Sequence, residues 1–352
     1  MSPASATPRI LVIRRRYLGD VVLLGSVFHS LRRHWPQAHL TVLVERAYAG
    51  VLAMNPDVDA ILTMPRGAFG WLGLVRALRR ENFTLVLDFD NRRKTAFITR
   101  LSGAACRVTL HHGPHVCLPR FYTRHEIVEA DFLVNRHITD YYHRMLRAMD
   151  VPLVSEPFSL TPREIDLDFI RRLPEFTSLP PGRPRLLVHP GSRSAYRVWP
   201  AEAFAEVCDR LQAEGTASVL LVAGPAEQKI VNAIRQHMRT PVACLQHPLE
   251  VPQLAALFAS VDLLLCHDSG PMHLAAAMGT RVVALYGSQS LANWRPIGPH
   301  HTVLQPPLPC VNCVSPGLCQ PDEPYFNHCV RNITVPDVLA ALRAQLRTAP
   351  IQ

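Results

Sequence analysis

The chain has 352 residues, of which 48% are hydrophobic and 18% charged, and its formal net charge is +9. Its length predicts two domains, and its composition excludes a disordered chain. No stretch approaches the roughly 18–20 apolar residues of a membrane-spanning helix, and the N-terminus lacks the layout of a secretory signal. We therefore expect a cytoplasmic protein with an anionic partner, and no nucleic-acid module supports nucleic acid as that partner.

The first half of the chain alternates between strand-like and helix-like segments. Apolar runs of strand length lie at 9–14, 40–44 and 84–88, with a shorter run near Ala60, and a segment of helical spacing lies at 21–31. Strands that alternate with helices are typical of βαβ units and a parallel sheet. This half is predicted to be an α/β domain.

A proline-rich connector at 151–184 precedes a second series of the same kind. Strand-like runs follow at 185–189, 218–224, 262–268 and 281–287. We predict two Rossmann-like, doubly wound parallel-sheet domains, 1–165 and 166–352, that face a central cleft at the carboxyl ends of the strands. The final helix, near 335–346, is free to pack back on the first domain.

The first polar loop, RRRYLGDVVLLG at 14–25, links a strand to a helix. It lacks the G-x-G-x-x-G fingerprint of dinucleotide-binding proteins. Asp20 lies where the helix begins, and two interpretations of it stay open. The carboxylate complements the helix dipole, or it faces the cleft and takes a proton from an attacking hydroxyl.

The second polar loop, HPGSRSAYRVWP at 189–200, also follows a strand and leads into a helix. In one interpretation it binds an anion through backbone amides, a hydroxyl and two guanidinium groups. The residues involved are Gly191, Ser192, Arg193 and Arg197. In the alternative, its tryptophan and final proline pack the loop and both arginines are solvated.

The third polar loop, CHDSGPMHLAAAMGT at 266–280, is the most informative. A buried strand brings Asp268, Ser269 and Gly270 to the amino end of an alanine-rich helix, where unpaired amides and the helix dipole attract a phosphate. His273 lies in the first turn of this helix. The alternative is an ordinary capped helix with a buried histidine.

Four of the nine cysteines cluster near the C-terminus, with the spacing C-x2-C-x5-C-x9-C. They are Cys310, Cys313, Cys319 and Cys329. Four thiolates at such short range can form a tetrahedral Zn or Fe site. Reduced structural thiols are the alternative, because this spacing is not a standard zinc-finger arrangement.

Several segments together resemble glycosyltransferase family 9, the lipopolysaccharide heptosyltransferases. These are ILVIRRRYLGDVVLLGSVFHSLRRHWPQAHLTVL, NPDVDAIL, HPGSRSAYRVWP and DSGPMHLAAAMGTRVVALYG, in the family's order. The resemblance implies a GT-B fold, inverting transfer from ADP-heptose, and no metal for catalysis. It makes Asp20 the base and places Arg197 where the family usually has Lys. It also assigns donor binding to Asp268, Ser269, Gly270 and His273.

The expected function is transfer of a heptose to the inner core of lipopolysaccharide, with a lipid A-core acceptor at the inner membrane. Positive charge near the leaving group replaces a metal. Basic residues in the N-terminal loops either bind the phosphorylated acceptor or form a solvated basic surface: Arg14, Arg15, Arg16, Arg92, Arg93 and Lys94. They also suggest peripheral attachment to the cytoplasmic face of that membrane. Two alternatives stay open: another GT-B nucleotide-sugar enzyme, with a different donor or an epimerase activity, and a non-catalytic binder of phosphorylated glycolipid.

Overall fold

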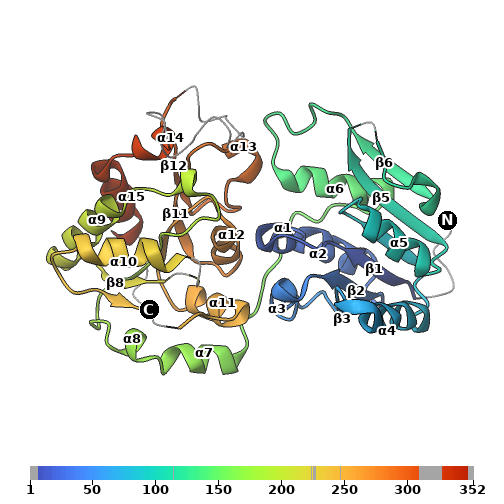
Figure 1. The fold of residues 1–352 in the computed structure, drawn as a ribbon, viewed down its shortest axis with the longest axis horizontal. Coiled ribbons are helices and arrows are strands. Elements are labelled where there is room, and N and C mark those ends of the chain that lie inside the picture. Colours follow the sequence, from blue (N-terminus) through green and yellow to red (C-terminus); the bar gives the residue numbers. More distant parts are fainter. Residues whose placement is uncertain are drawn as a thin grey trace. The chain divides into compact units, whose positions relative to one another are not determined.

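The computed structural model describes residues 7–113, 115–222, 224, 227–245, 247–308 and 327–347. The chain divides into two compact units, Met1–Thr161 and Pro162–Gln352. Each unit is a parallel sheet with helices on both of its faces (Figure 1). The prediction of two doubly wound α/β halves is therefore confirmed.

The first unit is built on six parallel strands over its described residues, in the order β3-β2-β1-β4-β5-β6. They are β1 (Arg9–Ile13), β2 (His39–Val44), β3 (Ala60–Thr63), β4 (Leu85–Asp88), β5 (Cys106–His112) and β6 (Arg124–Val128). In the register of the central strand, Ile10 lies between Leu40 and Leu85. The central strands are covered on both faces, which explains why they are nearly continuous apolar runs.

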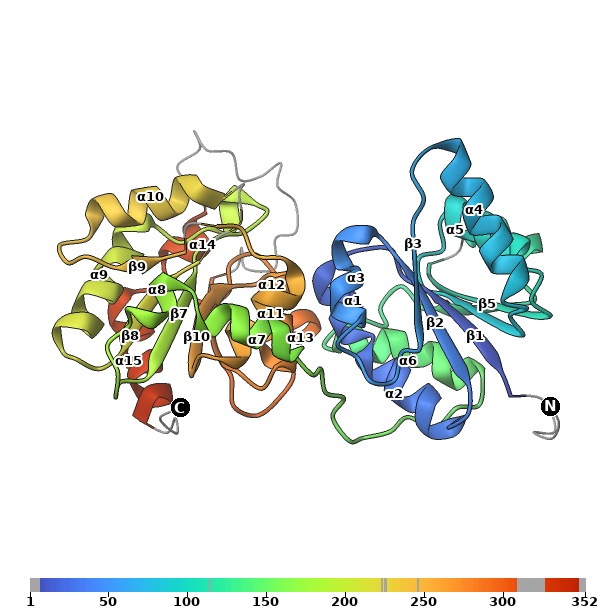
Figure 2. The ribbon, with the colours of Figure 1, turned by 90° about the horizontal axis from the view of Figure 1, so that it is seen from below.

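Helices of the first unit fill the connections between these strands. They are α1 (Leu18–Leu23), α2 (Gly25–His34), η1 (Arg46–Tyr48), α3 (Ala49–Leu52), α4 (Gly67–Arg80), α5 (Arg93–Leu101), η2 (Pro119–Phe121) and α6 (Ile138–Ala148). Leu78 of α4 and Ile98 of α5 pack in one cluster with Leu11 and Val86 of the sheet. Helices α4 and α5 therefore cover the same face of the sheet (Figure 2).

The second unit repeats this plan, with the strand order β12-β11-β10-β7-β8-β9. Its described strands are β7 (Arg185–His189), β8 (Ser218–Leu221), β9 (Ala243–Cys244), β10 (Leu263–His267), β11 (Arg281–Leu285) and β12 (Thr302–Leu304). Its described helices are α7 (Glu164–Arg171), α8 (Pro174–Thr177), η3 (Ala195–Arg197), α9 (Ala201–Ala213), α10 (Gln228–His237), α11 (Val251–Ala259), α12 (Gly270–Ala277), α13 (Leu291–Trp294), α14 (His328–Arg331) and α15 (Val335–Arg347). Across the described parts of both units, no helix combines the length and the apolar character needed to cross a bilayer.

Both sheets have the same topology once the strands of each unit are numbered from its own first strand. The direction in which strands are added reverses between β1 and β4 in the first unit, and between β7 and β10 in the second. Ligands of such sheets bind outside the carboxyl ends of the strands at this switch point. All three polar loops of the sequence follow switch-point strands: β1, β7 and β10.

The final helix, α15, packs within the second unit. Val338, Leu339 and Leu342 belong to that unit's hydrophobic core, and α15 contacts α9 and β11. The apolar face of α15 is therefore buried in the core of the second unit.

Candidate active site

Asp20 lies in the first turn of α1, just beyond the carboxyl end of β1, and only 6% of the residue is exposed. The Arg14 guanidinium and the Tyr142 hydroxyl both donate hydrogen bonds to its Oδ1. The backbone amide of Tyr17 donates to its Oδ2 at 3.0 Å. The carboxylate therefore stabilises the start of the helix, and it is also held in place by two side chains.

Arg14 forms ion pairs with two neighbouring carboxylates. In addition to its ion pair with Asp20, its Nη1 lies 3.6 Å from Asp90 Oδ1 and donates to the carbonyl of Phe89 at 3.0 Å. Burial opposes the charge of Arg14, but the oxygens of Tyr142, Asp20 and Asp90 outweigh it and raise the pKa of the guanidinium. In this structure Arg14 holds Asp20 in place through this ion pair.

Sequence reasoning missed the acidic turn after β4. Asp88 is fully buried, and it accepts hydrogen bonds from the Tyr122 hydroxyl at 2.7 Å and from the amides of Asp90 and Asn91 at 2.9 and 3.2 Å. Burial raises the pKa of Asp88 to about 6. The turn brings Asp90 next to Arg15, whose Nε donates a hydrogen bond to Asp90 Oδ2 at 2.8 Å. The only sequence signal was the pair of acids at the end of a buried strand.

The other basic residues predicted for acceptor binding lie at the same edge of the first sheet. Arg16 is half exposed, and its Nε lies 3.6 Å from Glu45 Oε1. Arg92, Arg93 and Lys94 are exposed at the amino end of α5, directly after the β4 turn. None of these last three forms an ion pair with a described residue. Their charges are therefore accessible at this edge.

In the second unit the two remaining polar loops lie side by side, because β7 pairs with β10 and His189 is opposite Cys266. Arg197 Nη1 lies 3.1 Å from Asp268 Oδ2, so Arg197 is paired rather than solvated. Trp199 is buried, and its amide donates to the ring of His267 at 2.9 Å. The tryptophan packs the loop, as the alternative interpretation expected.

The amino end of α12 lies at the carboxyl ends of the strands of the second sheet, directly after β10. Ser269 is the N-cap residue, and Gly270 is the first residue of the helix; both are partly exposed. The amides and dipole of such a helix end favour an anion. Asp268 is only 8% exposed, and burial raises its pKa to about 6 against the opposing charge of Arg197. His273 is buried, and the centroid of its ring lies 6.3 Å from that of the Trp294 ring.

Glu227 is a second residue that sequence reasoning missed. A Cβ at Gly191 would lie 2.0–2.5 Å from the Glu227 carboxyl group, so only glycine allows this close approach. Glu227 Oε2 accepts from the Gly224 amide at 2.9 Å and lies 3.5 Å from Nε2 of the buried His189. A carboxylate at this position can accept hydrogen bonds from ligand hydroxyls. Nothing in the local sequence distinguishes Glu227 from other surface acids.

The rest of the second loop is less buried. Ser192 Oγ accepts from the Ser194 amide at 3.4 Å, and the Arg193 side chain is exposed. The structure thus places the predicted residues of this loop and of the α12 loop at a single edge of the second sheet.

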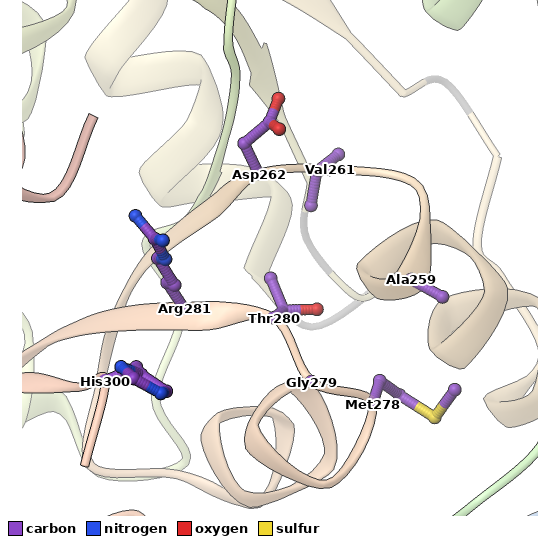
Figure 3. Close-up of a pocket in the computed structure, with 8 residues that line it drawn as sticks. All are labelled: Ala259, Val261, Asp262, Met278, Gly279, Thr280, Arg281 and His300. Atoms are coloured by element: carbon purple, nitrogen blue, oxygen red, sulfur yellow. The ribbon is translucent and has the colours of Figure 1, made fainter. Parts of the chain in front are cut away.

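A cavity of about 280 Å³ lies at the amino ends of the strands of the second sheet, at the other end of the strands from the polar loops (Figure 3). It is lined by Ala259, Val261, Asp262, Met278, Gly279, Thr280, Arg281 and His300. These residues surround the amino ends of β10 and β11, away from the switch-point loops. Asp262 is already used structurally, because its Oδ2 accepts from the Arg185 amide at 2.7 Å.

The predicted metal site falls largely beyond the described residues. Cys310, Cys313 and Cys319 lie in the range 309–326, outside the description, whereas Cys329 is buried in α14. Within the described ranges, no group of three or more His, Cys, Asp or Glu side chains is arranged to hold a metal ion.

The model of glycosyltransferase family 9 (heptosyltransferase) matches residues 71–318, well over half of the chain. The chain belongs to glycosyltransferase family 9. It is therefore a glycosyltransferase, and the resemblance to this family is confirmed.

Relatives of this family 9 enzyme span most of its length. Lipopolysaccharide heptosyltransferase 3 of Escherichia coli is 25% identical over 293 residues, covering 80% of this chain and 84% of the relative. The solved glycosyl transferase family 9 from Veillonella parvula has a TM-score of 0.84 at 22% identity, covering 98% and 99% of the two chains. The E. coli heptosyltransferase WaaC with ADP has a TM-score of 0.74 at 16% identity, covering 96% and 99%. The predicted GT-B fold is confirmed.

Proposed function

We propose that this family 9 glycosyltransferase moves a heptose from ADP-heptose to the inner core of lipopolysaccharide, with inversion at the anomeric carbon. The observation that carries the proposal is the pairing of Arg197 with Asp268 beside the amino end of α12, at the switch point of the second sheet. Relatives named for lipopolysaccharide heptosyl transfer, and a solved fold neighbour that holds ADP, support the substrate class.

In this proposal the second unit binds the donor. The diphosphate lies at the start of α12, where the helix dipole and the amides near Ser269 and Gly270 favour negative charge. Arg197 adds a guanidinium that stabilises the charge developing on the departing ADP. The loop at 191–193 contributes further amides, and Glu227 accepts hydrogen bonds from donor hydroxyls.

Asp20 acts on the acceptor. Its carboxylate takes the proton of the attacking hydroxyl, whose oxygen forms the new bond to the anomeric carbon as the bond to ADP breaks. A carboxylate has about four acceptor positions. Arg14, Tyr142 and the Tyr17 amide fill three of them. One position therefore remains for the substrate hydroxyl, and the three donors fix its direction.

The basic edge of the first unit supplies acceptor binding. Arg16, Arg92, Arg93 and Lys94 are proposed to bind anionic groups of a lipid A-core acceptor, whereas Arg14 orients the base. Arginine suits this role because its planar fork binds phosphate oxygens in pairs. This acceptor places the enzyme on the cytoplasmic face of the inner membrane.

The test is incubation of the full chain with a panel of nucleotide sugars and truncated core lipids, followed by mass spectrometry. We expect a lipid product one heptose heavier and stoichiometric ADP, only when both substrates are present. A nucleotide sugar changed without any acceptor would indicate an epimerase instead. Binding of the lipid with no change in either substrate would indicate a non-catalytic glycolipid binder.

Donor binding should strengthen as pH falls through about 6, because the raised pKa of Asp268 lies there. Protonation removes a negative charge beside the diphosphate and frees Arg197. Burial lowers the pKa of the facing His267 to about 3, so its ring stays neutral in this range, and burial also lowers the pKa of His189. Titration calorimetry with ADP-ribose, whose diphosphate does not titrate near this pH, measures the effect.

The Asp268→Asn variant is the matched control for this pH dependence. It should bind ADP-ribose with an affinity that changes less than that of the wild type over the same pH range. The expected difference is about tenfold, the equivalent of a coupling of one pKa unit. Identical pH profiles for the two proteins would contradict a role for Asp268 beside the diphosphate.

A further inference from the structure

We propose that the outward surfaces of α4 and α5 form a docking face for an anionic lipid bilayer. The docking face consists of Phe69, Leu72, Arg76 and Arg80 of α4 together with Phe97 and Arg100 of α5. Docking itself depends on these two helices alone. The proposed function enters only through the identity of the lipid substrate.

Helix α4 exposes apolar side chains at its amino-terminal end. Its inner side packs into the core through Leu74 and Leu78. Helical spacing puts residues 69, 76 and 80 on the opposite side. Phe69 is 91% exposed and Leu72 is 48% exposed, at the amino-terminal end of the helix. This outward side therefore begins with two large apolar side chains and continues with arginines.

Helix α5 has the same arrangement. Ile98 packs inward in the cluster that also holds Leu78 of α4, whereas Phe97 is 42% exposed and Arg100 is exposed. Because both helices cover one face of the sheet and contact each other, their outward sides face the same direction (Figure 2). The exposed aromatic rings thus belong to one surface.

The charged side chains of both helices are all basic. Neither α4 nor α5 contains an acidic residue. Their basic residues form no ion pair with any described residue: Arg76, Arg79, Arg80, Arg93, Lys94 and Arg100. Single exposed apolar residues are ordinary, but three of them on neighbouring helices among unpaired cations are typical of a membrane-surface element. Anionic headgroups complement the cations, and the apolar side chains enter the acyl boundary.

The position of the docking face fits a lipid-linked acceptor. Helix α4 follows β3 and α5 follows β4, so both helices begin at the carboxyl edge of the first sheet. That edge carries Asp20 and the basic residues proposed for the acceptor. A bilayer held against the docking face therefore presents its headgroups beside this edge.

The experiment is co-sedimentation of the full chain with phosphatidylglycerol-containing vesicles and with pure phosphatidylcholine vesicles. We expect binding to the anionic vesicles only. The double variant Phe69→Ser/Leu72→Ser should bind about tenfold more weakly, from the lost apolar contact. Arg76→Gln/Arg80→Gln should bind about 30-fold more weakly, since each of the two arginines near an anionic surface contributes about 1 kcal/mol.

A matched control is Ile165→Ser/Phe169→Ser on α7, where the two side chains are 73% and 39% exposed. It should bind vesicles as the wild type does. The proposal is overturned if the wild type ignores anionic vesicles, if the α4 variants bind undiminished, or if the α7 control loses as much as they do.

Transfer assays separate this inference from the proposed function. The Phe69→Ser/Leu72→Ser variant should match the wild type on a delipidated core oligosaccharide and lose activity on acceptor embedded in vesicles. Equal loss on both acceptors would contradict docking. If no acceptor is glycosylated by the wild type, the proposed function fails, and the vesicle-binding assay still decides whether the docking face exists.

Discussion

Asp20→Asn should lower kcat for heptose transfer by about a thousandfold, within the range of general-base catalysis. Affinity for ADP-heptose should stay close to that of the wild type, because the residues proposed to bind the donor belong to the second unit. Asparagine keeps the shape of the side chain and can still accept from Arg14 and Tyr142, but it cannot take a proton. Steady-state kinetics with both substrates, together with donor titration, measures the two quantities.

Two further variants distinguish loss of the base from loss of local structure. Asp90→Asn removes a different carboxylate that faces Arg14 and leaves Asp20 intact, so kcat should fall by less than about tenfold. Tyr142→Phe removes one hydrogen bond to Asp20 and leaves the bonds from Arg14 and the Tyr17 amide, so it should cause only a modest loss of kcat. If Asp90→Asn reduces kcat as severely as Asp20→Asn does, Asp20 has no special role.

Arg197→Gln should weaken the binding of ADP-heptose by about 10- to 100-fold, the value of a hydrogen bond to a charged group. The variant loses a positive charge at the diphosphate and leaves Asp268 without its partner, which lies 3.1 Å away. Both changes disfavour an anion at the start of α12. Titration calorimetry with ADP-heptose measures the loss directly.

Three controls sharpen this result. Arg197→Lys keeps the charge and should retain affinity within about tenfold, although lysine lacks the planar fork of arginine. Arg197→Gln/Asp268→Asn should recover part of the loss, because the unpaired carboxylate is neutralised as well. Arg235→Gln, on the exposed side of α10, should bind as the wild type does. If Arg197→Gln binds ADP-heptose as tightly as the wild type does, the diphosphate does not bind at this loop.

Much of the fold could be predicted from the sequence, because buried parallel strands are continuous apolar runs. The predicted strands at 9–14 and 262–268 correspond to β1 and β10 within a residue or two at each end. The strand-to-helix loops followed from the same pattern. The resemblance to family 9 then predicts that these loops bind the donor and supply the catalytic base.

The partners of the site residues could not be predicted, since they depend on which distant segments the fold brings together. Tyr142 is 122 residues from Asp20 in the chain, and Asp90 is 75 residues from Arg15. No periodicity or spacing links such pairs. For the same reason the sequence does not show that Arg14 pairs with two carboxylates, Asp20 and Asp90.

Glu227 illustrates a second limit of sequence reasoning. It follows β8, the neighbour of β7, so it reaches the loop after β7 only because of the strand order. The sequence predicts that Gly191 supplies a backbone amide to an anion, and in the structure it also leaves room for a carboxylate. The packing of two loops, rather than the composition of either one, determines this part of the site.

A structure of the enzyme bound to ADP would show most directly where its leaving group binds. We predict that phosphate oxygens lie within hydrogen-bond distance of the Arg197 guanidinium and of the backbone amides at the start of α12. ADP found with its phosphates bound elsewhere, and with Arg197 still paired only to Asp268, would contradict the account.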